Sequence, residues 1–440
     1  MQIVIPTPSL LKRVVGKQKH IESQVYRLMA YVVQYPVENG VLLYHALTCC
    51  MVLLSFDEAT HFAEIPELID LWFLVPEQHD DYKFCQQVLK VAQLFKTSDK
   101  SISTYTILTT TGCNARCFYC YERGTKPIAM TEETAEKTVR YIQEHRGENE
   151  VKLHWFGGEP LVNAKIIDYI CTRMSQENVP FKSQMISNGF LFDTEMVHRA
   201  KDLWHLKRIQ ITLDGIESTY NRIKNYIYGN VNAFERVLGN IERLTAASID
   251  VQIRLNVDTH NIAEISELIS FLHQRFGTQK HLSVYSRELY GKRTPEESAD
   301  LYQRRILLAQ QIAEFGYRRQ RELPKGIKLN GCMADDDHSV VVSPGGFLGK
   351  CEHCVDRDFF GHIDCEEIDE KMMCSFKERA NEIEACPTCP YYPQCIRLVK
   401  CEDGSECTPE RQKENIYNTI EAMKDEYQKY LTNHAHDTEI

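Results

Sequence analysis

The sequence predicts an α/β fold whose core is a partial (βα)6 barrel of the TIM type. Between residues 104 and 315, six strand patterns alternate with six helical patterns, as in consecutive βα units around a parallel sheet. Six units favour a partial barrel over a closed barrel of eight, and the pattern alone leaves a doubly wound sheet open. Ten of the 17 cysteines fall between Cys332 and Cys407. This clustering predicts three domains, at 1–100, 101–320 and 321–440.

Each barrel element follows from its own local pattern. The predicted strands are runs rich in β-branched residues at 104–110, 151–156, 183–187, 209–213, 251–257 and 282–286. The predicted helices lie at 131–145, 164–176, 193–203, 233–246, 262–276 and 295–315. Thr131 suits the N-cap of the first helix, because its hydroxyl can accept a hydrogen bond from the first turn. Glu132 and Glu133 then suit the positive end of the helix dipole.

The first hundred residues predict a small α+β domain built around a hairpin. Asn39-Gly40 is a strong signal for the hairpin turn. The predicted strands of this domain lie at 26–35, 41–47 and 51–56. The predicted helices lie at 57–72, with a break before Pro66, and at 82–95. Near the other end of the chain, we expect a polar helix over 409–431 and a frayed end over 432–440.

Composition narrows the class of protein. The net charge of −11 and the pI near 5.8 exclude nucleic acid as the main partner, because phosphate binding needs a basic surface. The longest apolar run, 41–56, is too short to span a bilayer, and no signal peptide is predicted. We therefore expect a soluble cytoplasmic protein without a membrane partner. Because the cytosol keeps thiols reduced, its 17 cysteines indicate metal or iron–sulfur binding rather than disulfides.

The strongest motif follows the first strand of the barrel, at the end where active-site loops lie in such folds. Its cysteines, Cys113, Cys117 and Cys120, have the spacing C-x3-C-x2-C. Three thiolates leave one iron of a [4Fe–4S] cluster without a protein ligand, and that iron can bind and reduce a cofactor. The alternative from spacing alone is a zinc site that lacks its fourth ligand.

This segment resembles the radical S-adenosylmethionine (SAM) superfamily, whose motif carries an aromatic residue before the last cysteine, here Tyr119. Later strand ends carry further matching residues. These are Gly157, Gly158, Glu159 and Pro160, then Ser187 and Asn188, and finally Asp214, Arg254 and Asn256. The resemblance implies that Glu159 accepts the methionine ammonium of SAM, and that Ser187 and Asn188 contact its ribose or carboxylate. It also implies that Arg254 binds the SAM carboxylate while Asn256 lines the site, although a structural ion pair for Arg254 stays open.

The C-terminal cysteines resemble the SPASM extension of radical SAM enzymes, which carries two auxiliary [4Fe–4S] clusters. The resemblance assigns Cys332, Cys351 and Cys401 to the first cluster, with Cys354 as a candidate further ligand. It assigns Cys386, Cys389, Cys395 and Cys407 to the second cluster. One interval departs from the family pattern, because five residues instead of three precede Cys401. Zinc ribbons are the alternative interpretation. With the first motif, the expected cofactors are three [4Fe–4S] clusters and SAM.

The N-terminal domain loosely resembles the winged-helix elements that recognise leader peptides of ribosomally made precursors. Such an element would bind the leader at residues 1–100 by adding a strand to an exposed edge. The resemblance therefore implies a maturase that forms a thioether or C–C cross-link in a precursor peptide. It also implies a flavodoxin or ferredoxin as the electron donor. One alternative is a sulfatase-maturating enzyme that makes formylglycine. In such enzymes one of the aspartates at 335–337 would be a base, although a charged loop is the favoured interpretation of these three residues. The other alternative is a zinc-binding interaction protein without catalysis.

Overall fold

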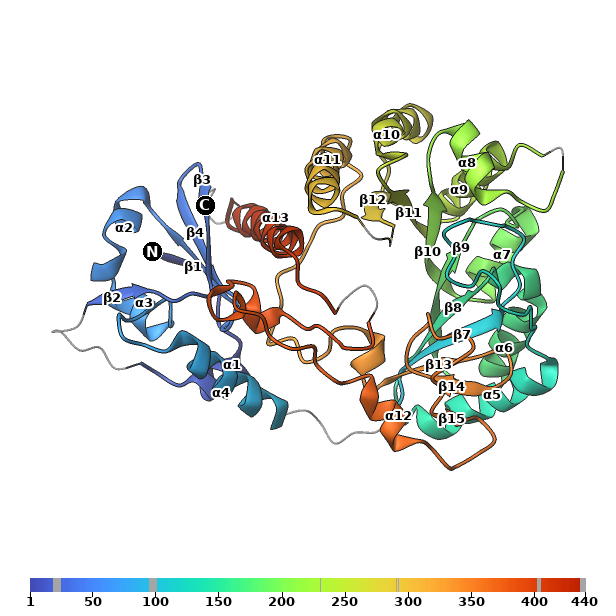
Figure 1. Cartoon of the computed structure of the whole chain (residues 1–440), viewed down its shortest axis with the longest axis horizontal. Helices are drawn as coiled ribbons and strands as arrows, with labels where there is room; N and C mark the ends of the chain where they lie inside the picture. Colours follow the sequence, from blue (N-terminus) through green and yellow to red (C-terminus); the bar gives the residue numbers. More distant parts are fainter. Residues whose placement is uncertain are drawn as a thin grey trace. The chain divides into compact units, whose positions relative to one another are not determined.

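The computed structural model describes residues 1–18, 25–94, 101–229, 231–289, 291, 293–401 and 405–435 (Figure 1). The chain forms two compact units. The barrel unit comprises 99–319 and 332–377, and the terminal unit comprises 1–98, 320–331 and 378–440. The predicted C-terminal domain, 321–440, thus contributes to both units, and the predicted division into three domains stays a prediction.

The sheet of the barrel unit confirms the predicted partial barrel. Its six parallel strands are β7 (Thr104–Thr110), β8 (Val151–Gly157), β9 (Phe181–Ser187), β10 (Leu206–Leu213), β11 (Asp250–Val257) and β12 (Leu282–Glu288). They are neighbours in chain order, from β12 back to β7. A doubly wound sheet would reverse this order midway. Beyond β7 the sheet continues through β13 (Ser339–Val342), β14 (Phe347–Gly349) and β15 (Gly361–His362).

Helices cover the outer side of this curved sheet (Figure 1). They are α5 (Glu132–His145), α6 (Ala164–Gln176), α7 (Thr194–Asp202), α8 (Glu217–Lys224), α9 (Ala233–Ala246), α10 (Ile262–Phe276) and α11 (Pro295–Glu314). Their apolar faces bury alternate strand residues, such as Leu153 and Trp155, in one large core. Thr131 caps α5 as predicted, with its hydroxyl accepting from the Thr134 N–H. The sequence prediction missed α8.

The terminal unit contains a four-stranded antiparallel sheet in the order β1-β5-β4-β3. Its strands are β1 (Gln2–Ile5), β3 (Val32–Val37), β4 (Gly40–His45) and β5 (Cys50–Leu54). Val37 pairs with Gly40, so the predicted hairpin is confirmed, with Glu38 and Asn39 as its loop residues. The single strand predicted over 26–35 was wrong. This segment divides into two strands, β2 (Tyr26–Leu28) and β3. β2 pairs with β6 (Leu74–Pro76) instead of the hairpin sheet, and the Met29 N–H donates to the carbonyl of Phe73, beside β6.

One of the helices predicted for this unit is divided into shorter segments. The continuous helix predicted over 57–72 was wrong, although the break before Pro66 is confirmed. The segments are α2 (Phe56–Thr60), the 3-10 turn η1 (Phe62–Glu64) and α3 (Pro66–Asp70). The remaining helices are α1 (Ser9–Val15), α4 (Asp81–Leu94) and α13 (Pro409–Ala435). Of the predicted frayed end, 432–435 is helical and 436–440 lies outside the described residues. No described helix is long and apolar enough to cross a membrane.

Candidate active site

The predicted site residues of the barrel gather at the carboxyl ends of its strands. The cysteine loop, residues 113–120, follows β7, and the turn at 157–160 begins at the last residue of β8. Ser187 ends β9 and Asn188 follows it. Asn188 joins two of these segments, because its side-chain amide donates to Asn114 Oδ1 at 2.7 Å and lies 4.0 Å from Cys113 Sγ. Parallel strands bring their ends to one edge of the sheet, and this edge therefore collects the motifs.

Two glycines let the β8 turn approach the cysteine loop. Gly157 has a φ of +119°, and a Cβ there would lie 2.2 Å from the Thr110 carbonyl oxygen. A Cβ on Gly158 would lie 2.5 Å from the carbonyl oxygen of Gly112. Backbone bonds follow from this contact, since the Glu159 N–H donates to Gly112 O at 3.0 Å. Pro160 then begins the 3-10 helix η2 (Pro160–Asn163). Only glycine permits this approach.

The Glu159 carboxylate is fully buried and already accepts three bonds from the chain. Its Oε1 accepts from the Leu161 N–H at 3.1 Å and from the Ser187 hydroxyl at 2.9 Å, and its Oε2 accepts from the Asn188 N–H at 2.8 Å. Burial raises the pKa of Glu159 to about 7, although these donors lower it. In this structure Glu159 therefore ties the end of β9 to the β8 turn. Its predicted contact with SAM stays a prediction.

A buried polar network holds Tyr119, the aromatic residue of the cysteine loop. Its hydroxyl donates to Asp214 Oδ1 at 2.8 Å and accepts from Lys224 Nζ at 3.1 Å. Lys224 also pairs with Asp214 Oδ2 at 2.9 Å, and Asn256 donates to Asp214 Oδ1 at 2.8 Å. Burial lowers the pKa of Lys224, but Asp214 and Tyr119 outweigh it and raise that pKa well above its usual value. The network joins β10, β11, α8 and the cysteine loop. Arg254 extends it, since its Nε donates to Asn256 Oδ1 at 2.8 Å.

Lys224 is the main residue of this site that the sequence did not reveal. It ends α8, a short polar helix that gives no strong apolar pattern. Its place along the chain, well beyond the Leu213-Asp214-Gly215 strand end, gives no signal either. Its contacts with Tyr119 join positions 105 residues apart. Only the folded barrel brings them together.

The three thiols of the cysteine loop suit an iron–sulfur cluster that leaves one iron open. Burial raises the pKa of the Cys113 thiol to about 12, with Glu159, Cys117 and Cys120 close enough to contribute. The Ala115 N–H donates to Cys113 Sγ at 3.3 Å, a contact that stabilises a thiolate. Within the described ranges, no three His, Cys, Asp or Glu side chains are grouped to hold a single metal ion. The three thiols nevertheless lie close enough to influence one another's charge.

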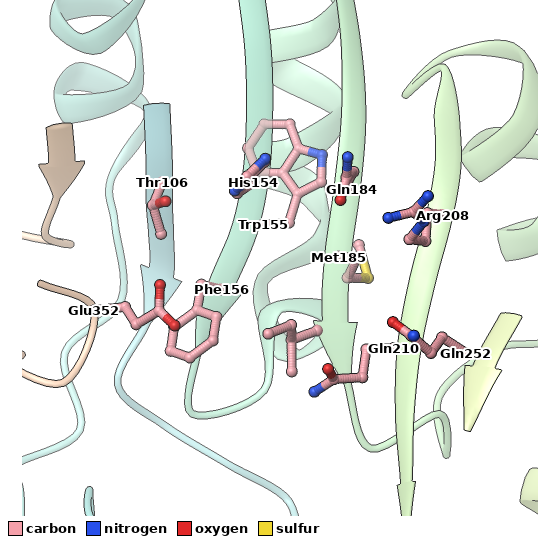
Figure 2. Close-up of a pocket in the computed structure, with 11 residues that line it drawn as sticks. Thr106, His154, Trp155, Phe156, Gln184, Met185, Arg208, Gln210, Gln252 and Glu352 are labelled. Carbon is pink, nitrogen blue, oxygen red and sulfur yellow. The ribbon is translucent and has the colours of Figure 1, made fainter. Parts of the chain in front are cut away.

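A cavity of about 140 Å³ with polar and apolar lining residues lies on the inner face of the sheet (Figure 2). Its lining side chains include Thr106, His154, Phe156, Gln184, Ile186, Arg208, Gln210, Gln252 and Glu352. Except for Glu352, which follows β14, these residues alternate along the strands with the apolar residues that face the helices, as the period of two requires. Burial lowers the pKa of His154, which keeps its ring neutral. Burial raises the pKa of Glu352, and the nearby Arg254 opposes that shift. Arg208 is therefore the only cationic lining side chain among the described residues.

The barrel unit also holds three of the predicted auxiliary ligands, Cys332, Cys351 and Cys354. The Ala334 N–H donates to Cys332 Sγ at 3.3 Å, and the Cys354 N–H donates to the Cys351 carbonyl at 3.1 Å. The neighbouring aspartates make structural contacts. Asp335 accepts from the Cys332 N–H at 2.9 Å, Asp336 from the Ser339 hydroxyl at 3.1 Å, and Asp337 pairs with Lys377.

The terminal unit holds the other predicted auxiliary ligands. Cys389, Cys395 and Cys407 lie close enough to influence one another, and Cys386 lies close to Cys389. The Ile383 N–H donates to Cys386 Sγ at 3.3 Å, and Gln412 Nε2 to Cys407 Sγ at 3.4 Å. This donor set suits a four-thiolate cluster. Cys401 belongs to this unit, whereas Cys332 and Cys351 belong to the other, and its assignment to the first auxiliary cluster stays a prediction.

The six cysteines without a predicted ligand role divide into two groups. Four are buried, as expected of small apolar side chains: Cys49, Cys50, Cys85 and Cys171. The other two, Cys365 and Cys374, are exposed.

A partial barrel that carries a three-cysteine loop after its first strand is typical of one class of enzymes. Residues 107–272 match the family model described as the radical SAM superfamily. The chain therefore contains a radical SAM domain.

Curated relatives match mainly across this domain. An uncharacterized protein of Methanocaldococcus jannaschii is 27% identical over 167 residues, which are 37% of this chain and 56% of that protein. A GTP 3′,8-cyclase of Clostridium perfringens is 23% identical over 274 residues, or 58% of this chain and 81% of the cyclase. The sporulation killing factor maturation protein SkfB of Bacillus subtilis is 25% identical over 169 residues, or 37% of this chain and 38% of SkfB. The matched region thus spans about half or less of the first and third relatives.

Two solved structures share the fold more widely. Native anSMEcpe with bound AdoMet has a TM-score of 0.55 at 14% identity and covers 75% of this chain and 98% of its own. Streptococcus suis SuiB bound to S-adenosylmethionine has a TM-score of 0.51 at 12% identity and covers 85% of this chain and 95% of its own. At these identities the likeness shows the fold alone.

Proposed function

We propose that this protein is a radical SAM/SPASM maturase that forms a thioether or C–C cross-link in a ribosomally made precursor peptide. The observation that carries the proposal is the combination of a three-thiol loop at the barrel edge with a second cysteine group in the terminal unit. SkfB is named as a maturation protein, and SuiB has been solved with its precursor peptide SuiA. Both names support a peptide as the substrate class.

The residues of the chain would divide the work as follows. Cys113, Cys117 and Cys120 would hold a [4Fe–4S] cluster that leaves one iron for SAM. Gly157 and Gly158 would let the β8 turn pack closely against the loop, and Asn188 would orient it. When bound, the cluster and SAM supply a 5′-deoxyadenosyl radical that removes a hydrogen atom from the substrate.

The cavity on the inner sheet face would bind the peptide segment to be modified. Its amides, on Gln184, Gln210 and Gln252, offer both donors and acceptors that match a peptide backbone. Charge argues against GTP, the substrate in the name of several relatives. A triphosphate needs several cations, whereas Arg208 is the only cationic side chain among the described residues that line the cavity.

The terminal unit would bind the leader peptide. A groove of about 560 Å³ lies between the edge strand β3 and helix α13. Tyr35, Val37, Tyr427 and Leu431 supply its apolar lining. Pro36 removes one backbone donor from this edge, so side-chain contacts with α13 would supplement strand pairing. Leu431→Asp should therefore weaken leader binding at least about tenfold. Leu307→Asp, a change at an exposed leucine of α11, is the matched control.

The test is an anaerobic incubation of the reconstituted protein with SAM, a reductant and the short peptide encoded beside its gene. We expect the peptide to lose two hydrogen atoms for each cross-link, as read by mass spectrometry, and 5′-deoxyadenosine to form. A peptide that stays unchanged while SAM is cleaved would refute this substrate. A sulfatase-derived peptide converted to formylglycine would then establish the alternative reaction. Zinc without acid-labile sulfide would instead identify a non-catalytic zinc protein.

A further inference from the structure

The last residue of α8, Lys224, contacts the cysteine loop through both its backbone and its side chain. The final carbonyls of a helix lack partners within the helix. Here the carbonyl of Lys224 accepts from the Arg116 N–H of the loop at 2.8 Å. Just beyond the helix, the Ile227 N–H donates to the Asn114 carbonyl at 2.9 Å. The loop thus caps the helix, and two backbone bonds join them.

The side chain of Lys224 reaches a second point on the same loop. Lys224 is buried, with 2% of the residue exposed. Its ammonium donates to Thr212 Oγ1 at 2.6 Å and to the Tyr119 hydroxyl at 3.1 Å. The ion pair with Asp214, at 2.9 Å, fixes the ammonium on β10. Since Tyr119 lies between Cys117 and Cys120, its hydroxyl contacts restrain the part of the loop that carries two of the three thiols.

We infer that Lys224 is a positioning residue that holds the cysteine loop in its cluster-binding conformation before any cluster is present. The backbone contact fixes residues 114–116, and the side-chain contact fixes Tyr119. Asp214 and Thr212 hold the buried ammonium in place, so its contact with Tyr119 starts from a fixed point. Removing the charge leaves Asp214 buried without its cation and removes one of the three hydrogen bonds of the Tyr119 hydroxyl, whose other partners are Asp214 and Asn256. The loop then samples conformations in which its thiols are more accessible.

Thiol alkylation of the iron-free full chain measures this restraint directly. In Lys224→Met we expect iodoacetamide to react with Cys117 and Cys120 roughly tenfold faster than in the wild type, relative to exposed Cys365. Cys171, which is 0% exposed, reports loss of the whole fold and should stay protected. Lys201→Met makes the same chemical change at an exposed lysine of α7 and should leave all rates unchanged.

Unchanged alkylation of Cys117 and Cys120 in Lys224→Met, with Cys171 protected, would overturn the inference. If Cys171 becomes reactive, the barrel has unfolded and Tyr119→Phe decides. That variant keeps the Lys224–Asp214 pair and removes the bonds of the hydroxyl to Lys224, Asp214 and Asn256. A rise of about threefold supports restraint of the loop through this buried network, to which Lys224 belongs, and no rise overturns the inference. The inference rests on the proposed cluster site, yet the two fail differently. Wild-type protein that binds no iron refutes the cluster site, whereas an unrestrained loop in the iron-free wild type refutes the role of Lys224.

Discussion

Replacing Gly158 with alanine should displace the cysteine loop. The added Cβ would lie 2.5 Å from the Gly112 carbonyl oxygen, whereas ordinary contacts begin near 3.4 Å. The difference, 3.4 − 2.5, requires a movement of about 0.9 Å. Because the contact is with backbone, no side-chain rotation can relieve it. Gly112 directly precedes Cys113, so the movement passes to the first thiol of the loop.

A displacement of this size should affect chemistry more than stability. Overpacking costs about 1–3 kcal/mol, which a stable domain tolerates. A misplacement of about 1 Å in a reacting group can lower a rate about 100-fold. We therefore expect Gly158→Ala to fold, and to release 5′-deoxyadenosine from SAM about 100-fold more slowly than the wild type.

The assay is chromatographic quantitation of 5′-deoxyadenosine under anaerobic reducing conditions, with iron measured on the same sample. Gly239→Ala is the matched control, because its Cβ would meet only the end of a flexible arginine at 3.6 Å. This control should keep the wild-type rate and gain up to about 1 kcal/mol of stability within α9. Wild-type rates in Gly158→Ala would refute the claim that this close approach positions the loop.

Three further predictions concern the cofactor, the loop and the terminal unit. Cys117→Ala should lower bound iron by about 4 of about 12 atoms per chain, as measured on the reconstituted protein. Asn188→Ala removes the bond to Asn114 and should speed alkylation of Cys113 about fivefold, the effect of roughly 1 kcal/mol. Burial lowers the pKa of His45 from 6.5 to about 4. Below pH 6.5 the unfolded chain therefore binds a proton at His45 that the folded chain does not bind. The free energy of unfolding, measured in urea, should fall by about 2 kcal/mol from pH 7 to pH 5. His45→Phe should abolish most of that loss.

Local chemistry made much of the barrel predictable. Strand β7 and helices α6, α9 and α10 have the predicted bounds, because each combines a clear apolar period with end signals in its own sequence. The order of the strands followed from short βα connections. The motifs at the strand ends could also be placed on one edge of the sheet, because parallel strands in consecutive βα units all end on the same side.

The predictions that failed did so because contacts between distant parts of the chain decided the structure. Residues 26–35 carry one continuous strand pattern, yet Met29 turns to bond with Phe73, a contact that no local rule contains. Lys224 lies in a polar helix, and its side chain is buried because it pairs with Asp214, which lies on another element. Sequence reasoning identifies groups that bind cofactors through their spacing, but it does not identify groups that hold those residues in place.

The cysteine loop is restrained by three other parts of the barrel unit. The β8 turn contacts its start through Gly158, β9 contacts Asn114 through Asn188, and α8 contacts Arg116 and Tyr119 through Lys224. Three exposed thiols on a free loop would adopt many arrangements, and a cluster would have to offset the entropy of ordering them. Anchoring from separate strands and a helix removes that cost in advance. The barrel therefore determines the shape of the loop, and the thiols are presented at its edge before iron is bound.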